Sequence, residues 1–294
     1  MINALFDPQV FLSSDHVWDC PKSRNVFLDQ LDKHLEFIDS LGDAYILWCD
    51  EFDARLWSHP QLPPWKKSRE WDIRLSQILY RNLTKHRKRI DISQLVQGEC
   101  HPPVHCSCLI AHDIFLRLVT AVFRNALTPH FCPSNDNITN EDHRFRAAPT
   151  DPWSQFQEVR GPEDWPKKIV ATQMFWPISK NNGGRFRKCI ELVALSKDIA
   201  LGQLQRFSFT HRFIEDLLPA SRKNRIAEII VHRLTLSMQE AARDPQLQDE
   251  QLASGERRFR VTPRPSSLRI HYEFLNGELV FQRFYDEGHH DDGL

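Results

Sequence analysis

Glycine is scarce in this chain, with 10 glycines among 294 residues. So few glycines argue against a glycine-rich nucleotide-binding fold and against a sheet protein built from many tight turns. The patterns G-x-x-x-x-G-K-[ST], G-x-G-x-x-G, H-E-x-x-H and G-x-S-x-G do not occur. Their absence counts against an NTPase, a Rossmann dehydrogenase, a zincin protease and an α/β-hydrolase.

Long apolar runs and an excess of one charge are also missing. No window approaches the roughly 18 uninterrupted apolar residues that a membrane span requires, and the N-terminal residues lack the pattern of a signal peptide. The 7 cysteines are odd in number and scattered, unlike a disulfide framework. The net charge is −1, so any affinity for nucleic acid must come from local patches. We expect a cytoplasmic protein with reduced thiols and no membrane contact.

What the chain does contain is typical of a globular protein, with 41% apolar and 26% charged residues. Apolar residues at helical spacing, together with one short apolar run, predict alternating helices and strands in the first half. Asn25 is the expected N-cap of the first helix, and Gly42 its expected end. The helices are predicted over 25–41, 70–90 and 108–127, and the buried strand over 44–49.

The residues 128–166 are rich in proline, asparagine and aspartate and show no sustained period, which indicates a long loop or linker. We therefore expect two lobes of an α/β or α+β protein: a mixed helix/strand lobe over 1–127, and an α+β lobe over 167–294 that ends in a β-hairpin. In the second lobe we predict a strand over 169–176, a segment of mixed character over 189–204 and a helix over 224–242.

Asn276-Gly277 is a strong hairpin signal because both residues tolerate the positive φ of a type I′ turn. It predicts a hairpin over 268–285 with one buried face and one wet or functional face. The pairs predicted on the buried face are Phe274 with Leu279, Tyr272 with Phe281, and Leu268 with Tyr285. The residues predicted on the other face are Arg269, His271, Glu273 and Gln282.

Acidic residues of the first half come from two separate segments. Asp7 lies in a first strand-like segment, and Asp50, Glu51 and Asp53 follow the strand 44–49. Carboxylates that converge from different segments can hold Mg²⁺ or Mn²⁺, which organise the attack of water on a phosphodiester. The same acids also have a structural explanation, because Asp50 suits an N-cap and acids in a first helical turn complement the helix dipole.

This order of an acid, a helix, and a strand that runs into an acidic helix start resembles the layout of PIN-like nucleases, within residues 1–130 at most. The resemblance implies a metal-dependent nuclease in which Asp7 and Glu51 are the catalytic, metal-binding acids, and Asp53 is a further candidate ligand. Pro8 and Gln9 depart from the family, in which small polar residues usually follow the first Asp. Candidates for its later acids are Asp113, Asp136 and Asp142.

A second cluster combines thiols and imidazoles, the ligands that zinc prefers. It lacks the C-x₂-C pairs of standard zinc sites, so a turn leading into a buried helix with small apolar cysteines explains it better, and zinc is favoured less than Mg²⁺ or Mn²⁺ as a cofactor. Its members are Cys100, His101, His105, Cys106, Cys108, His112 and Asp113.

Basic residues gather in three segments, and in two of them phenylalanine is interleaved. Arg and Lys neutralise phosphates and aromatic rings stack on bases, although a charge run is more often a solvated face. We expect the turn at 181–184 to present Arg185 and Arg187. The candidate nucleic-acid-binding residues are Lys85, Arg87, Lys88, Arg89, Arg185, Arg187, Lys188, Arg258 and Arg260.

The C-terminal tail carries His289, His290 and Asp291, which are candidates to complete a site or to dock a partner. The leading hypothesis is a metal-dependent nuclease that acts on RNA or DNA. The overall character of the chain is similar to that of uncharacterised proteins from bacterial defence or mobile-element loci. The alternative is a non-catalytic subunit that binds nucleic acid or docks a protein through its hairpin and tail.

Overall fold

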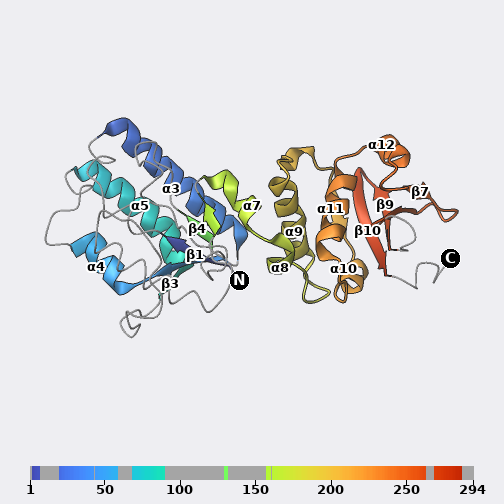
Figure 1. Cartoon of the computed structure of the whole chain (residues 1–294), viewed down its shortest axis with the longest axis horizontal. Helices are drawn as coiled ribbons and strands as arrows, with labels where there is room; N and C mark the ends of the chain where they lie inside the picture. The colour runs from blue at the N-terminus through green and yellow to red at the C-terminus, as the bar shows by residue number, and fades with distance from the viewer. Residues whose placement is uncertain are drawn as a thin grey trace, which may run out of the picture. The chain divides into compact units, whose positions relative to one another are not determined.

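The computed structural model of the chain describes residues 2–6, 20–42, 44–58, 68–89, 129–131, 157–159, 161–262 and 268–286. The chain forms two compact units, Met1–Lys168 and Ile169–Leu294 (Figure 1). Each unit combines helices with a five-stranded sheet, which confirms the predicted mixture of helix and strand. Among the helices of these described ranges, none is long and apolar enough to cross a membrane.

The first unit contains a parallel sheet and helices that precede or follow its strands. The strands are β1 (Ile2–Phe6), β2 (Ala44–Trp48), β3 (Arg87–Arg89), β4 (Pro129–Phe131) and β5 (Gln157–Val159). The helices in the described part of this unit are α3 (Pro21–Leu41), α4 (Asp50–Ser58), α5 (Arg69–His86), the 3₁₀ turn η3 (Pro162–Asp164) and α7 (Trp165–Lys168).

The sheet of the first unit has the strand order β3-β2-β1-β4-β5, and every neighbouring pair is parallel. The carboxyl ends of all five strands therefore meet at one edge. The chain adds β2 and β3 on one side of β1, then crosses to add β4 and β5 on the other. Open parallel sheets bind their ligands outside the carboxyl ends of the strands, at such a switch point, which here lies between β1 and β4.

The helix α3 begins earlier than predicted. Its N-cap is Cys20 with Pro21 at the first helical position, where the missing N–H of proline costs nothing. The expected N-cap, Asn25, lies inside the helix, and its Oδ1 accepts a hydrogen bond from Arg74 Nη1 at 3.1 Å. Gly42 ends the helix with a φ of 75°, as predicted.

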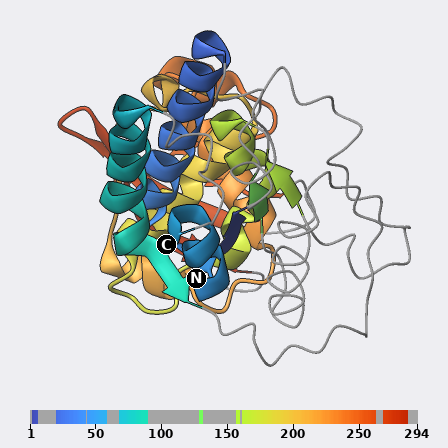
Figure 2. The ribbon, with the colours of Figure 1, turned by 90° about the vertical axis from the view of Figure 1, so that its left-hand side faces the viewer.

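The apolar face of α3 is buried, as its spacing predicts, and α3 packs along α5 and on β2 (Figure 2). The helix predicted over 70–90 ends four residues early, at His86. Arg87–Arg89 instead form β3 beside β2, because the parallel register pairs Arg89 with Trp48 and completes the edge of the sheet.

The segment 128–166 is not a loop throughout. Its described parts include β4 and β5, which extend the first sheet, and the start of α7. Trp165 of α7 is fully buried and donates from Nε1 to Nδ1 of the buried His34 at 2.8 Å. This segment therefore belongs to the first unit where it is described. The helix predicted over 108–127 lies outside the described residues.

The second unit packs helices against a mixed sheet with the order β6-β10-β9-β8-β7, in which only the β6–β10 pair is parallel. The strands are β6 (Phe207–Phe209), β7 (Glu250–Gln251), β8 (Arg257–Arg260), β9 (Arg269–Leu275) and β10 (Glu278–Tyr285). The helices are α8 (Ala171–Met174), α9 (Gly183–Ser196), the 3₁₀ turn η4 (Leu201–Gln203), α10 (His211–Leu217), α11 (Lys223–Leu234) and α12 (Met238–Arg243).

Two predictions for this unit are wrong in part. The strand predicted over 169–176 is instead the short helix α8, whose apolar residues pack against α9 and α11. The helix predicted over 224–242 is broken into α11 and α12. Ser237 causes the break, because its hydroxyl caps α12 by accepting from the Glu240 N–H while Glu240 accepts from the Ser237 N–H. The mixed segment 189–204 is helical up to Ser196.

The C-terminal hairpin is present. Asn276 and Gly277 have φ values of 51° and 79°, as a type I′ turn requires. The predicted pairs of Phe274 with Leu279 and Tyr272 with Phe281 are confirmed. Beyond them the register shifts by one residue between Phe281 and Arg283, so Tyr285 pairs with Arg269 rather than with Leu268. The alternating pattern does not reveal such a β-bulge.

The two faces of the hairpin are not divided as predicted. Phe274 is 47% exposed because it lies beyond the last residue pair between β8 and β9. Arg269 and His271, predicted on the wet or functional face, are buried. His271 Nδ1 lies 3.2 Å from Glu256 Oε2, and its ring lies 4.6 Å from that of Tyr285. Burial lowers the pKa of His271 below its usual range.

Candidate functional site

The first candidate site is the carboxyl edge of the parallel sheet. There Cys49 follows β2, and α4 begins directly with Asp50, Glu51 and Asp53 in its first turn. Asp7, the residue after β1 in the sequence, lies outside the described residues. β1 and β2 are adjacent and parallel, so their carboxyl ends lie at the same edge of the sheet.

The residue that caps α4 is Cys49, not Asp50 as expected. The Cys49 carbonyl accepts from the Asp53 N–H at 3.2 Å, and its Sγ accepts from the Phe52 N–H at 3.4 Å. Burial raises the pKa of this thiol to about 12. The thiol is therefore protonated at neutral pH and is not a nucleophile, although it lies at the carboxyl edge of the sheet.

Two of the three acids at the start of α4 are held by neighbouring side chains. Asp53 Oδ1 accepts from Trp48 Nε1 at 2.9 Å, and its Oδ2 lies 3.4 Å from Arg89 Nη2. Arg89 Nη1 lies 2.9 Å from Asp50 Oδ1. Arg89 comes from the carboxyl end of β3, so it ties α4 to the edge of the sheet. These contacts agree with the structural explanation of the acids as a helix start of matched charge.

Glu51 differs from its two neighbours. It is half-buried, and no side chain of the described residues hydrogen-bonds or forms an ion pair with its carboxylate. Within the same described ranges, no three His, Cys, Asp or Glu side chains are grouped as they would be to hold a metal ion. Glu51 is therefore the predicted acid whose carboxylate stays available at this edge, and any further metal ligand has to come from another segment.

Several predicted site residues cannot be placed. These are Asp7, the later acids Asp113, Asp136 and Asp142, the cluster Cys100, His101, His105, Cys106, Cys108 and His112, and the tail residues His289, His290 and Asp291, all of which lie outside the described residues. The side chains of Lys85, Arg87 and Lys88 also lie outside the described part, although their backbones form the end of α5 and β3.

We expected a turn to present the second basic segment, but its arginines lie in a helix. Arg185 and Arg187 lie in α9, and both point at backbone carbonyls. Arg185 donates to the carbonyls of Met174 and Trp176, and Arg187 donates to that of Phe207. These guanidinium groups hold neighbouring segments together, so fewer of their donors remain for a phosphate. Lys188 is half-buried on the same helix.

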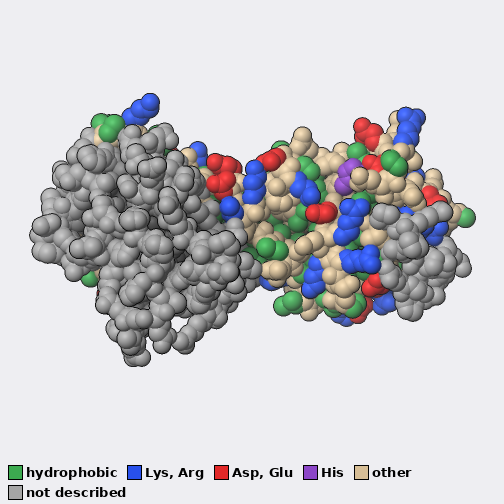
Figure 3. All heavy atoms as spheres, viewed as in Figure 1, with side chains coloured by type: hydrophobic (Ala, Val, Ile, Leu, Met, Phe, Trp, Pro, Cys, Tyr) green, Lys and Arg blue, Asp and Glu red, His purple; other side chains and the backbone are tan. Residues whose placement is uncertain are grey.

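The third basic segment lies on β8. Arg258 Nε donates to Glu250 Oε1 of the neighbouring strand β7 at 2.7 Å, and Arg260 is half-buried beside Arg269 in the register. On the face of the second unit drawn in Figure 3, Lys and Arg side chains alternate with Asp and Glu. In this segment acids of the same unit, such as Glu250, balance part of the positive charge.

A basic segment that was not predicted as a site lines a pocket in the second unit. Residues 221–225 read Ser-Arg-Lys-Asn-Arg and include the N-cap and the first residues of α11. They line the pocket together with Thr172 and Gln173 from α8. The signal in the sequence was the sign of the charge, because cations are unfavourable at the start of a helix.

Comparison with known proteins adds no relative to this description. No family model, no curated protein and no solved structure matches the chain.

Proposed function

We propose that this protein is a metal-dependent nuclease acting on RNA or DNA, with its site at the carboxyl edge of the parallel sheet. One observation supports the proposal most: the strand order β3-β2-β1-β4-β5 makes β1 and β2 parallel neighbours beside the switch point. Asp7 follows one of these strands and Glu51 follows the other. Carboxylates supplied from two adjacent parallel strands suit a hard cation.

In this proposal Glu51 is a ligand of Mg²⁺ or Mn²⁺, because its carboxylate has no described partner and carboxylate oxygens are the donors that such ions prefer. Asp7 is the second ligand. Asp53, which the sequence offered as a further ligand, is not a ligand in this proposal, because Trp48 and Arg89 already hold its two oxygens. The ion would polarise a phosphodiester and activate a water molecule. Arg89 holds Asp50 and Asp53 in place at the start of α4, on either side of Glu51 in the sequence.

The test uses the full chain with Mn²⁺ on a panel of labelled RNA and single-stranded DNA. Glu51→Gln and Asp7→Asn are each expected to lower the cleavage rate roughly a hundredfold or more, because each removes a ligand of an ion worth several kcal/mol in the transition state. Asp72→Asn is the matched control, since Asp72 also lies in the acidic first turn of a helix, α5. It should cleave like the wild type, and a chelator should stop cleavage until Mn²⁺ is restored.

The second candidate function is a non-catalytic subunit that binds nucleic acid or a protein partner in the cytoplasm. The contacts of Asp50 and Asp53 with Arg89 and Trp48 favour it, because they explain these acids without any ligand. An inert wild-type protein, or a Glu51→Gln variant that cuts as fast as the wild type, would reject the nuclease and leave this alternative.

A further inference from the structure

A pocket of about 440 Å³ lies in the second unit where α8 meets the start of α11. It is lined by Thr172, Gln173, Ser221, Arg222, Lys223, Asn224 and Arg225. Three of these residues are cations, and among the residues that the structure describes no Asp or Glu lines the pocket. The charge of the lining therefore suits an anion with several oxygen acceptors.

The contacts of the lining residues keep the pocket in shape. Arg225 Nε donates to the Val261 carbonyl at 2.9 Å, and Thr172 Oγ1 donates to Asn224 Oδ1. Lys223 Nζ lies 5.6 Å from the centre of the Trp176 ring. Arg225 is therefore anchored through one nitrogen, and Lys223 is steered by an aromatic face that leaves its ammonium donors available.

The cations lie at a helix start, where the helix dipole disfavours them. α11 runs from Lys223 to Leu234, and its N-cap is Arg222, whose side chain does not cap the N–H groups of the first turn. Its first turn contains no acid. A helix start carries partial positive charge, so cations there repel the helix dipole and destabilise the free protein. An anion in the pocket would relieve this repulsion, and it would meet the cations and the polar side chains together.

We propose that this pocket binds a phosphate group, held by Arg222, Lys223 and Arg225. The phosphate belongs either to a nucleic acid or to a small phosphorylated molecule. The proposal does not depend on the nuclease, because all of the lining residues belong to the second unit and the candidate metal site belongs to the first.

The experiment measures binding of inorganic phosphate to the full chain by calorimetry at constant ionic strength. We expect saturable binding, and a melting temperature that rises with phosphate concentration relative to chloride, since a ligand of the native state stabilises it. Arg222→Gln should weaken phosphate binding roughly tenfold through loss of a charge-assisted hydrogen bond, and Lys223→Gln should act similarly.

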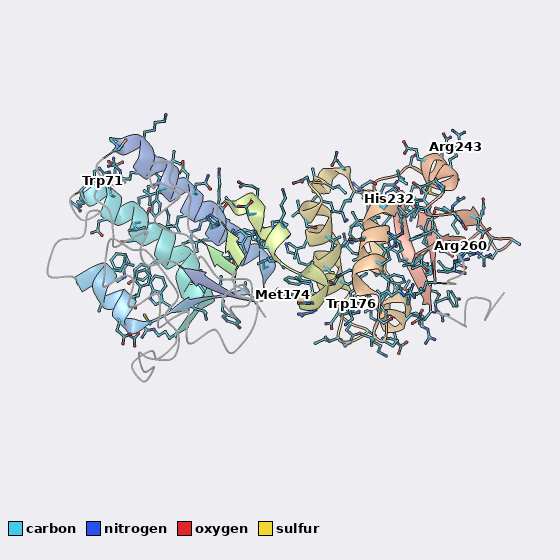
Figure 4. All side chains as sticks on the ribbon, in the orientation of Figure 1. Trp71, Met174, Trp176, His232, Arg243 and Arg260 are labelled. Carbon is cyan, nitrogen blue, oxygen red and sulfur yellow. The ribbon has the colours of Figure 1, made fainter. Side chains whose placement is uncertain are left out.

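Arg243→Gln is the matched control. Arg243 is an exposed arginine of the same unit, in the last turn of α12. Figure 4 places it at the opposite side of the unit from Trp176, which lies beside Lys223. The control removes the same charge, so its phosphate affinity should change by less than roughly twofold, as expected for a screened surface charge.

Binding of two oligonucleotides, one with a 5′-phosphate and one with a 5′-hydroxyl group, is compared with binding of inorganic phosphate to identify the source of the phosphate. Tighter binding of a 5′-phosphorylated oligonucleotide than of its 5′-hydroxyl form assigns the pocket to a terminal phosphate. If the two oligonucleotides bind equally and Arg222→Gln weakens the binding of both, the pocket binds a phosphate of the nucleic-acid backbone. Binding of inorganic phosphate alone assigns it to a small molecule. The proposal is overturned if the wild type binds no phosphate in any form, or if Arg243→Gln weakens binding as much as Arg222→Gln.

Discussion

Two helices of this protein begin with opposite charge. α4 starts with Asp50, Glu51 and Asp53, and α11 starts at Lys223 after an arginine cap, with Arg225 in its first turn. Acids complement the positive end of the helix dipole and cations oppose it. The acidic start is therefore what folding alone favours, whereas the basic start reduces stability and calls for another explanation.

The difference changes which residues suggest a function. Asp50 and Asp53 stabilise α4 and are held by Arg89 and Trp48, so they need no ligand. Glu51 stands apart because its carboxylate has no described partner. At α11 the basic residues line a pocket, and the first turn of the helix contains no acid. A cluster of charge is thus more informative when it opposes the local backbone field than when it agrees with it.

The other end of α11 gives the largest expected effect. Arg233 lies in its last turn, where a cation suits the dipole, and it is fully buried. Its Nε lies 3.0 Å from Asp249 Oδ2, and its Nη2 donates to the Tyr272 hydroxyl at 2.9 Å. Arg233→Met should cost about 3 kcal/mol or more, because Asp249 remains buried with one of its two arginine partners gone.

Chemical denaturation, with hydrogen exchange of the β9 and β10 amides, measures the effect of Arg233→Met. Arg243→Met is the control for a surface position and should change stability by less than about 0.5 kcal/mol. Equal stability of the two variants would mean that the cation at the C-terminal end of α11 does not hold the sheet, and the contrast between the two ends of the helix would be lost.

The carboxylates at the start of α4 differ in role: Asp53 is held by neighbouring side chains, whereas Glu51 is available to bind a ligand. Asp53→Ala should lower stability by about 1–3 kcal/mol, because the buried Trp48 N–H loses its acceptor. Glu51→Ala should change stability by less than about 0.5 kcal/mol, since its carboxylate has no described partner. Denaturant titration of both variants measures this. A Glu51→Ala variant as unstable as Asp53→Ala would make Glu51 a structural acid as well.

The sequence predicted the elements that local pattern determines. The apolar face of α3 follows from residues three and four apart, β2 from a short apolar run, and the hairpin turn from Asn276-Gly277. The strands β3, β4 and β5 have three residues each, too few to show a period. Only their pairing with β2, with β1 and with each other makes them strands.

The candidate sites were predictable to a smaller extent. The sequence allowed two explanations of the acids after β2, as metal ligands or as the charged start of a helix. It did not predict that Arg89, 36 residues from Asp53, holds two of these acids. The basic segments were visible as charge, whereas the carbonyl partners of Arg185 and Arg187 depend on tertiary packing. The run 221–225 was missed because its significance depends on where α11 begins.

The smallest effect tests the basic helix start directly. Arg222→Asp places an acid at the N-cap of α11, where its oxygen can accept from the free N–H groups of the first turn. In phosphate-free buffer we expect stability to rise by about 0.5–1 kcal/mol, measured by denaturant titration, while phosphate binding is lost. Arg243→Asp, the same change in the last turn of α12, should instead lower stability slightly, because an acid there opposes the dipole. If Arg222→Asp destabilises the protein as Arg243→Asp does, then Arg222 stabilises the fold, and the cost in stability that we ascribe to the basic start of α11 does not exist.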